Sequence, residues 1–200
     1  MAVGAGADAL GLVSEMPSGP GVIDEAEIAE IARIVPPPIA TFLLTSRKTA
    51  DGIADQVHAV GVNTVQIVDH IDPGEYARLR VRLPTTKIVQ VVHVTGRESI
   101  DIARRYATLA DVLLLDSGNP HKAVAELGGT GRTHDWALSR QIIACVHVPV
   151  FLAGGLRPEN IAEAIVAVRP FGVDLCSGVR TNGELDPEKL TRFIAALNAA

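Results

Sequence analysis

The chain alternates short apolar runs with segments of helical periodicity along its whole length. Seven runs are nearly continuous in Val, Ile and Leu, as expected for strands that are covered on both faces. They are Ala9–Val13, Ile39–Leu44, Thr64–Val68, Ile88–Val94, Val112–Asp116, Val148–Ala153 and Gly172–Cys176. A segment of helical pattern follows each run, so that strand and helix repeat every roughly 25 to 28 residues. This alternation predicts an α/β fold with a parallel sheet.

The helical segments between these runs carry start signals of their own. The segments are Glu25–Ile34, Thr49–Val60, Gly74–Arg82, Glu98–Thr108, Asp135–Ala144, Pro158–Val168 and Pro187–Ala199. Asp24 and Asp186 are suitable N-caps, and Pro158 and Pro187 suit a first helical turn, where the missing amide costs nothing. No linker or low-complexity tract interrupts the repeat, so we expect residues 1–200 to form a single (β/α)-barrel domain.

The number of strands bears on whether the sheet is open or closed. Strand–helix repeats form either an open doubly wound sheet or a closed (β/α)₈ (TIM) barrel, which needs eight strands. The segment Ala2–Ala7 has the pattern of a helix tail with a Gly-rich stop. We therefore expect a (β/α)₈ barrel without its first strand and most of its first helix. The two strand edges that such a gap exposes favour a homodimer or poor solubility.

Charge and composition exclude several classes of partner. The formal net charge is −5 from 18 Lys and Arg against 23 Asp and Glu, with no basic run. This argues against nucleic acid and against an anionic membrane surface, although backbone amides can still bind a small anion. No apolar stretch reaches the roughly 18 residues of a membrane span. Two cysteines without a leader pattern favour a reducing, cytoplasmic location.

Three glycine-bearing segments near the C-terminus follow three successive predicted strands. They are Gly128–Thr133, Ala153–Gly155 and Ser177–Arg180. Glycines let a backbone approach a ligand closely and turn its amides toward an anion, and the last loops of a (β/α)₈ barrel commonly bind phosphate. We expect a phosphate site formed by Gly129, Thr130, Gly131, Gly154, Gly155, Ser177 and Gly178. The alternative is that these glycines only shape strand-to-helix turns.

Asp116 is the predicted catalytic residue, because it ends an apolar strand on the side where barrel enzymes react. An apolar setting raises the pKa of a carboxyl and suits it to general acid catalysis. The alternative interpretation is that Asp116 only caps a turn. Gln66 on one predicted strand and Asp174 and Cys176 on the last are candidate substrate contacts, although Cys176 also fits as a small core residue. No histidines or cysteines have metal-ligand spacing, so no metal site is expected.

The order of these motifs resembles the phosphoribosylanthranilate isomerase family of tryptophan biosynthesis. The matching segments are Gly6–Gly11, Val65–Gln66, Leu114–Ser117, Gly128–Gly131 with Asp135–Trp136, Leu152–Leu156, Pro158–Asn160, and Val173–Asp174 with Ser177–Val179. The resemblance implies an Amadori rearrangement of N-(5-phosphoribosyl)anthranilate, a small phosphorylated substrate, without a cofactor. It also implies that Asp116 is the general acid and that the glycine segments hold the phosphate.

The sequence departs from the family pattern at several positions. The family's catalytic cysteine, in a Lys-Ile-Cys-Gly context on the first strand, has no counterpart here, and Cys176 is a candidate substitute base. The family's arginine after the second strand meets the segment 17–21, which has no arginine. Val68 stands in place of a histidine, and Arg180 in place of a glutamate.

Two explanations of these departures remain open at this stage. Either the reading frame starts late, or the chain is a paralogue with changed chemistry. The alternative functions are a non-catalytic or re-purposed sugar-phosphate binder and another sugar-phosphate isomerase or epimerase on the same scaffold.

Overall fold

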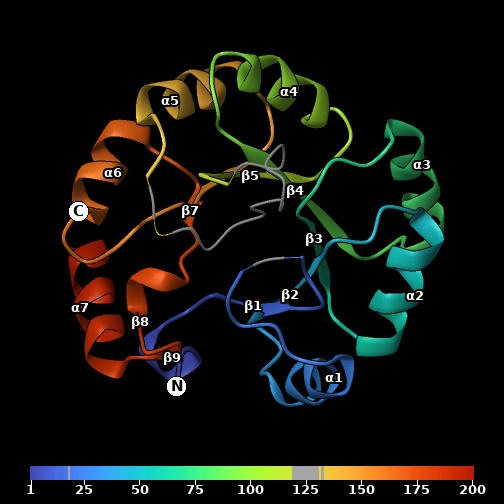
Figure 1. The fold of residues 1–200 in the computed structure, drawn as a ribbon, viewed down its shortest axis with the longest axis horizontal. Coiled ribbons are helices and arrows are strands. Elements are labelled where there is room, and N and C mark those ends of the chain that lie inside the picture. Colours follow the sequence, from blue (N-terminus) through green and yellow to red (C-terminus); the bar gives the residue numbers. More distant parts are fainter. Residues whose placement is uncertain (18, 119–130, 132) are drawn as a thin grey trace.

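The computed structural model of the chain describes residues 1–17, 19–118, 131 and 133–200. In this described part, one parallel sheet contains seven strands in chain order. They are β1 (Ala9–Val13), β2 (Ala40–Thr45), β3 (Thr64–Ile67), β4 (Lys87–His93), β5 (Val112–Asp116), β6 (Val150–Leu152) and β7 (Gly172–Val173). The sheet curls, and the helices surround it on the outside (Figure 1). The predicted α/β class and barrel architecture are confirmed.

The helices lie close to the predicted segments because most of the predicted start signals operate. They are α1 (Glu25–Ile34), α2 (Ala50–Val60), α3 (Pro73–Arg82), α4 (Glu98–Tyr106), α5 (Trp136–Cys145), α6 (Ile161–Val168) and α7 (Pro187–Asn198). Asp24 accepts a hydrogen bond from the amide of Glu27, and Asp186 accepts from the amides of Glu188 and Lys189. Such caps satisfy amides that have no partner within the helix. No helix among the described residues is long and apolar enough to cross a membrane.

Four short elements complete the described structure. They are the 3₁₀ turns η1 (Val3–Ala5) and η2 (Ser177–Val179) and the strands β8 (Arg180–Thr181) and β9 (Glu184–Leu185). β8 and β9 pair as an antiparallel hairpin beyond the main sheet (Figure 1). α7 follows this hairpin and packs against both η1 and η2. The two ends of the chain therefore meet around the last helix.

Apolar side chains gather in two layers on the two faces of the sheet. The larger layer lies between sheet and helices and includes fully buried residues such as Ile28, Leu43, Leu113 and Phe193. The smaller layer contains no helix residue and centres on Val68, Val89, Val91, Leu114 and Ala153. This second layer fills the inside of the curled sheet, which we call the lumen. Because side chains alternate along a strand, every second residue of each strand faces the lumen.

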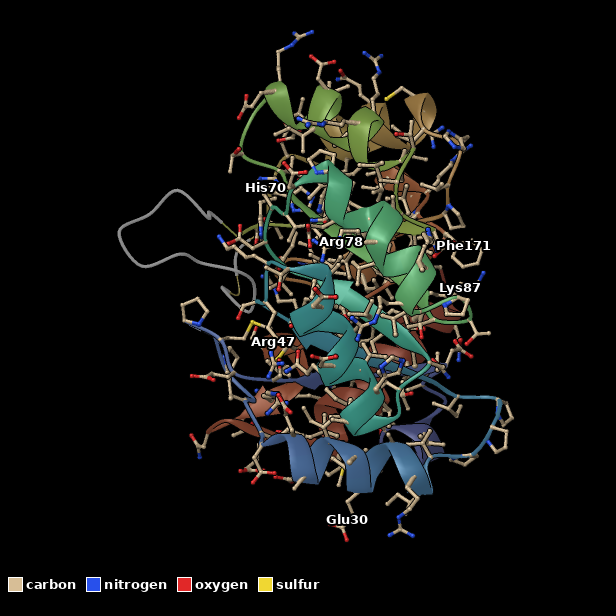
Figure 2. The ribbon with its side chains drawn as sticks, turned by 90° about the vertical axis from the view of Figure 1, so that its right-hand side faces the viewer. Glu30, Arg47, His70, Arg78, Lys87 and Phe171 are labelled. Carbon is tan, nitrogen blue, oxygen red and sulfur yellow. The ribbon has the colours of Figure 1, made fainter. Side chains whose placement is uncertain are left out.

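The strands all run in one direction, which gives the sheet two distinct ends. Arg47 and His70 follow β2 and β3, and Figure 2 shows both at the same side of the molecule. Lys87, which begins β4, and Phe171, which precedes β7, lie at the opposite side (Figure 2). We call the end formed by the carboxyl termini of the strands the mouth. Residues that follow a strand at this end are brought together from all parts of the chain.

The sheet is open between its first and last strands in the described part of the chain. The order runs from β1 to β7, and these two strands do not pair with each other. The carbonyl of Val13 accepts a hydrogen bond from the amide of Ile23, and Val13 forms an isolated parallel bridge with Val22. This short contact covers the mouth end of β1. The open arrangement is the one expected for seven strand–helix units.

Two boundaries differ from the sequence expectation. Pro158 was expected in the first turn of a helix, but α6 begins only at Ile161. The side chain of Asn160 bonds to the backbone of Gly155 and Arg157 and so holds the residues before α6 in a loop. The last strand of the sheet was expected to continue to Cys176, but β7 ends at Val173. Asp174 therefore lies just beyond the strand, at the mouth.

Candidate active site

A row of polar side chains crosses the lumen at the mouth. His93 of β4 and Asp116 of β5 are direct partners in the register of these strands. Asp174 continues the row after β7, where its amide donates a hydrogen bond to the carbonyl of Leu152 at 2.9 Å. Residues paired across neighbouring strands point to the same face of a sheet. The fold thus brings two carboxyl groups and an imidazole to the same end of the lumen.

Asp116 is buried, with 7% of its surface exposed. Burial raises the pKa of its carboxyl, because the charged form loses its hydration. The amide of Ser117, which donates to Oδ1 at 2.6 Å, and the charge of His93 act in the opposite direction. The balance keeps the pKa above its ordinary value and favours a carboxyl that holds a proton. A group of this kind can act as a general acid.

Asp174 has the second perturbed carboxyl of the row. Its residue surface is exposed toward the mouth, yet protein surrounds the carboxyl closely enough that loss of hydration is the largest cause of its shift. Together with the negative charge of Asp116, this raises the pKa of Asp174 to about 6. Two interacting carboxyls titrate as a pair. We conclude that Asp116 and Asp174 take up their first shared proton at a higher pH than ordinary carboxyls.

His93 is a site residue that the sequence analysis did not identify. It is buried, with 5% exposed, and donates from Nε2 to the carbonyl of Val68 at 3.0 Å. Its Nδ1 is buried without a hydrogen-bond partner in the part of the chain that the structure describes. The alternation of Val89, Val91 and His93 along β4 is the sequence signal that places this imidazole in the lumen.

A small pocket of about 30 Å³ lies beside the two carboxyl groups and opens to solvent. It is lined by Asp116, Gly131, Ala153–Leu156 and Asp174–Ser177. The structure therefore brings all three glycine-bearing segments to one place, since Gly131, Gly154 with Gly155, and Ser177 each come from a different one. Gly129 and Thr130, two of the predicted phosphate-binding residues, lie outside the described residues.

Two glycines in this region are required by their surroundings. Gly154 has a φ of +82°, and a Cβ there would lie 2.9 Å from the amide nitrogen of Ser117. Gly178 approaches the neighbouring loop so closely that a Cβ would lie 1.9 Å from the carbonyl oxygen of Leu156. No side chain fits at such distances. These glycines fix the backbone of the loops after β6 and β7 against each other and against the end of β5.

Asn160 braces the loop that follows β6. Its side-chain amide donates to the carbonyl of Gly155 at 3.0 Å, and its Oδ1 accepts from the amide of Arg157 at 2.9 Å. The side chain is nearly buried, so both bonds are shielded from competing water. The loop that carries Gly154 and Gly155 is therefore held in one conformation by a side chain outside the pocket.

The remaining candidate contacts lie at different depths. Gln66 faces the lumen on β3 and is buried, but it pairs in register with Val89 and is not among the residues that line the pocket. Cys176 does line the pocket and is half-buried as a free thiol. Burial and, to a lesser degree, Asp174 and Asp116 raise the pKa of this thiol, whereas Arg180 lowers it.

The sequence matches the N-(5'-phosphoribosyl)anthranilate isomerase family over residues 21–196. The isomerase of Methanocella arvoryzae is 36% identical over 187 residues, which cover 94% of this chain and 85% of the relative. The isomerase of Halobacterium salinarum is 39% identical over 200 residues, covering 99% of this chain and 89% of the relative.

Solved structures show the same similarity. The phosphoribosylanthranilate isomerase of Thermotoga maritima superposes with a TM-score of 0.84 at 28% identity, over 100% of this chain and 92% of that one. A second isomerase structure, bound to reduced 1-(o-carboxyphenylamino)-1-deoxyribulose 5-phosphate, has a TM-score of 0.81 at 26% identity and covers 100% of this chain and 91% of that one. The chain therefore belongs to the phosphoribosylanthranilate isomerase family, the aldose–ketose isomerases of tryptophan biosynthesis.

Proposed function

We propose that this chain catalyses the Amadori rearrangement of N-(5-phosphoribosyl)anthranilate with Asp116 as the general acid. The observation that carries the assignment is the position of Asp116, whose buried carboxyl lies at the mouth of the lumen and lines the glycine-rich pocket. Its raised pKa favours the protonated form that the first step needs. The carboxyl would donate its proton to the furanose oxygen as the ring opens.

The rearrangement itself balances without an external oxidant or reductant. Protonation of the ring oxygen lets the C1′–O bond break and leaves a protonated imine at C1′. Loss of the proton from C2′ gives an enol, and protonation at C1′ with loss of the enol O–H proton then yields the ketone. C1′ is reduced while C2′ is oxidised within the same molecule. We therefore propose that the reaction uses no cofactor.

The phosphate group would bind at the glycine-lined side of the pocket. Backbone amides near Gly131, Gly154, Gly155, Ser177 and Gly178 are the proposed ligands, because amides that point into a concave site attract anions. Gly129 and Thr130 stay predictions. The isomerase that was solved with a reduced product analogue, itself a 5-phosphate, supports a small phosphorylated ligand for this chain.

Gln66, Asp174 and Cys176 remain proposed contacts to the rest of the substrate. The raised pKa of the Cys176 thiol argues against a thiolate base at this position, because a protonated thiol cannot accept the C2′ proton. Asp174, whose pKa of about 6 leaves it largely ionised at neutral pH, is better suited to polar contacts with the ribose.

The test is a turnover assay that follows the loss of anthranilate-substrate fluorescence with the purified chain. We expect substrate to be consumed and the ribulose phosphate product to form. Thermal stabilisation by ribose 5-phosphate without turnover would instead indicate a sugar-phosphate binder without this activity. Turnover of other sugar phosphates alone would indicate a different isomerase or epimerase.

We also propose that the chain forms a homodimer in the cytoplasm. The open edges of β1 and β7 in the described sheet present unpaired backbone groups, and strand edges of this kind favour association. One structure of the Thermotoga maritima isomerase is described as monomers generated from a dimeric enzyme. Size-exclusion chromatography with light scattering tests the proposal, and a stable soluble monomer would contradict it.

A further inference from the structure

Arg180 spans the mouth between the last strand of the sheet and the first. It begins β8, directly after η2, and its guanidinium reaches the loop that follows β1. A Cβ added at Gly21 would lie only 3.3 Å from Nη2 of Arg180. The same guanidinium interacts with the thiol of Cys176 through its charge and a side-chain hydrogen bond, and it thereby lowers the pKa of the thiol. Cys176 lines the pocket. Arg180 thus connects the pocket with the side of the mouth formed by β1.

Arg180 differs from Arg47, Lys48 and Arg157 in having no carboxylate partner among the residues that the structure describes. Arg47 pairs with Glu25, Lys48 with Asp69, and Arg157 with Glu159. Its Nη1 donates to the carbonyl of Gly183 at 2.5 Å, and no described carboxylate lies within ion-pair distance of its guanidinium. A guanidinium without a counter-ion in the described part of the chain is able to bind an anionic group of a ligand.

The backbone of Arg180 is held in place before any ligand binds. Arg180 pairs with Leu185 across the β8–β9 hairpin, and its carbonyl accepts a hydrogen bond from Nζ of Lys189 at 2.8 Å. The bond from Nη1 to Gly183 orients the guanidinium itself. A preorganised side chain loses little conformational freedom on binding, which favours affinity.

The proposed substrate carries two anionic groups at opposite ends. Its phosphate is proposed to bind at the glycine-lined side of the pocket. This assignment leaves the carboxylate of the anthranilate ring without a cation. The segment 17–21 after β1 contains no basic residue, although the family pattern has an arginine there. The guanidinium of Arg180 lies against Gly21 of that segment. Its planar fork of donors matches a carboxylate in two-point contact.

We propose that Arg180 binds the carboxylate of the anthranilate half of the substrate and so determines specificity for it. This inference rests on the proposed function, because it assumes that substrate. The assignment follows from the position of the guanidinium across the mouth, its lack of a described carboxylate partner, and the absence of a basic residue in the facing loop.

Binding of two matched ligands tests the proposal. One is reduced 1-(o-carboxyphenylamino)-1-deoxyribulose 5-phosphate, and the other is the same compound without the carboxylate. Their Kd values are measured by calorimetry for the wild type, Arg180→Gln, Arg180→Lys and the control Lys48→Gln, which removes an exposed cation from the same end of the molecule. Thermal melting confirms that each variant is folded.

We expect Arg180→Gln to weaken the carboxylated ligand about tenfold or more, as for loss of a charged hydrogen bond. The ligand without the carboxylate should change by less than about twofold, because its phosphate contacts are intact. Arg180→Lys should be intermediate, since it keeps the charge and loses the fork, and Lys48→Gln should leave the Kd of both ligands unchanged.

Three results would overturn the proposal. Equal weakening of both ligands by Arg180→Gln would assign Arg180 to the phosphate or to the local fold. Unchanged binding of both ligands to Arg180→Gln would show that Arg180 does not contact the ligand. A wild type that does not prefer the carboxylated ligand would overturn it even if both Arg180 variants failed to fold. If the wild type turns over the substrate in any of these cases, the proposed function stands and only the role of Arg180 fails.

Discussion

The two sides of the mouth differ in how their polar groups are arranged. After β6 and β7, the pocket is lined by loop residues that include Gly154 and Gly155, and the side chain of Asn160 holds the carbonyl of Gly155. After β2 and β3, long side chains such as Arg47 and Lys48 are engaged in ion pairs with their neighbours. Backbone recognition depends on a few glycines at fixed places, whereas side-chain recognition can be supplied from different elements. A phosphate site on the first side would therefore tolerate few substitutions, whereas side chains on the second side could be exchanged more freely.

The largest effect is expected from Asp116→Asn, which removes the proposed general acid that lines the pocket. The variant keeps the shape of the side chain but cannot donate the proton, so kcat should fall by about 100-fold or more. Asp72→Asn is the matched control, because Asp72 is an exposed N-cap of α3 and Asn caps a helix as well. Turnover of Asp116→Asn at the wild-type rate would exclude Asp116 as the general acid.

A smaller effect, confined to the phosphate side, is expected from Gly178→Ala. The added methyl group cannot fit 1.9 Å from the carbonyl oxygen of Leu156, so the loops after β6 and β7 must separate. Overpacking of this kind costs about 1–3 kcal/mol of stability. We expect ribose 5-phosphate to raise the Tm of the wild type, and this rise should be lost in Gly178→Ala.

The control for this variant is Gly4→Ala, because a Cβ at Gly4 meets nothing within 4 Å. Its Tm and its response to ribose 5-phosphate should match those of the wild type. If Gly178→Ala still gains the full stabilisation from ribose 5-phosphate, the contact between the two loops is not needed for the phosphate site.

The smallest expected effect is a change in how stability depends on pH. The pKa of Asp174 is raised from its ordinary value of 3.8 to about 6, so the folded chain holds a proton that the unfolded chain releases in this range. Stability should therefore fall as pH rises from about 4 to 6 and then level off. Asp174→Asn should remove this part of the pH dependence.

Thermal melting of the wild type and Asp174→Asn across this range measures the difference directly. The difference between the two proteins reports the interacting pair of Asp174 and Asp116. It removes the contribution of groups that titrate in both proteins, such as Asp69 and Asp111, whose pKa values are lowered by their ion pairs. Parallel melting curves at all pH values would show that the Asp174 carboxyl is not perturbed in the folded state.

The elements that follow local rules were predicted well from sequence. The strand and helix pattern, the caps at Asp24 and Asp186, and the position of Asp116 each depend on a short stretch of chain. Three glycine segments met at one pocket because parallel strands bring their carboxyl ends together. That residues 1–200 form a single domain stays a prediction.

The features that depend on contacts between distant segments were not predicted. The alternation along β4 places His93 in the lumen, but its position beside Asp116 depends on the register of β4 with β5, which the sequence of β4 alone does not give. The start of α6 is set by the hydrogen bonds of Asn160 rather than by Pro158. Arg180 reads as a simple departure from the family pattern until the structure places its guanidinium beside Gly21.

The close approach of Gly178 to Leu156 has a consequence for redesign of this barrel. The loops after β6 and β7 are in contact at their backbones, so neither can change length or path alone. A graft that brings in one of them from another barrel would place a foreign carbonyl or a Cβ at this junction. Loop exchange should therefore succeed only when both loops are transferred together as one unit, with the residue at position 178 kept as glycine.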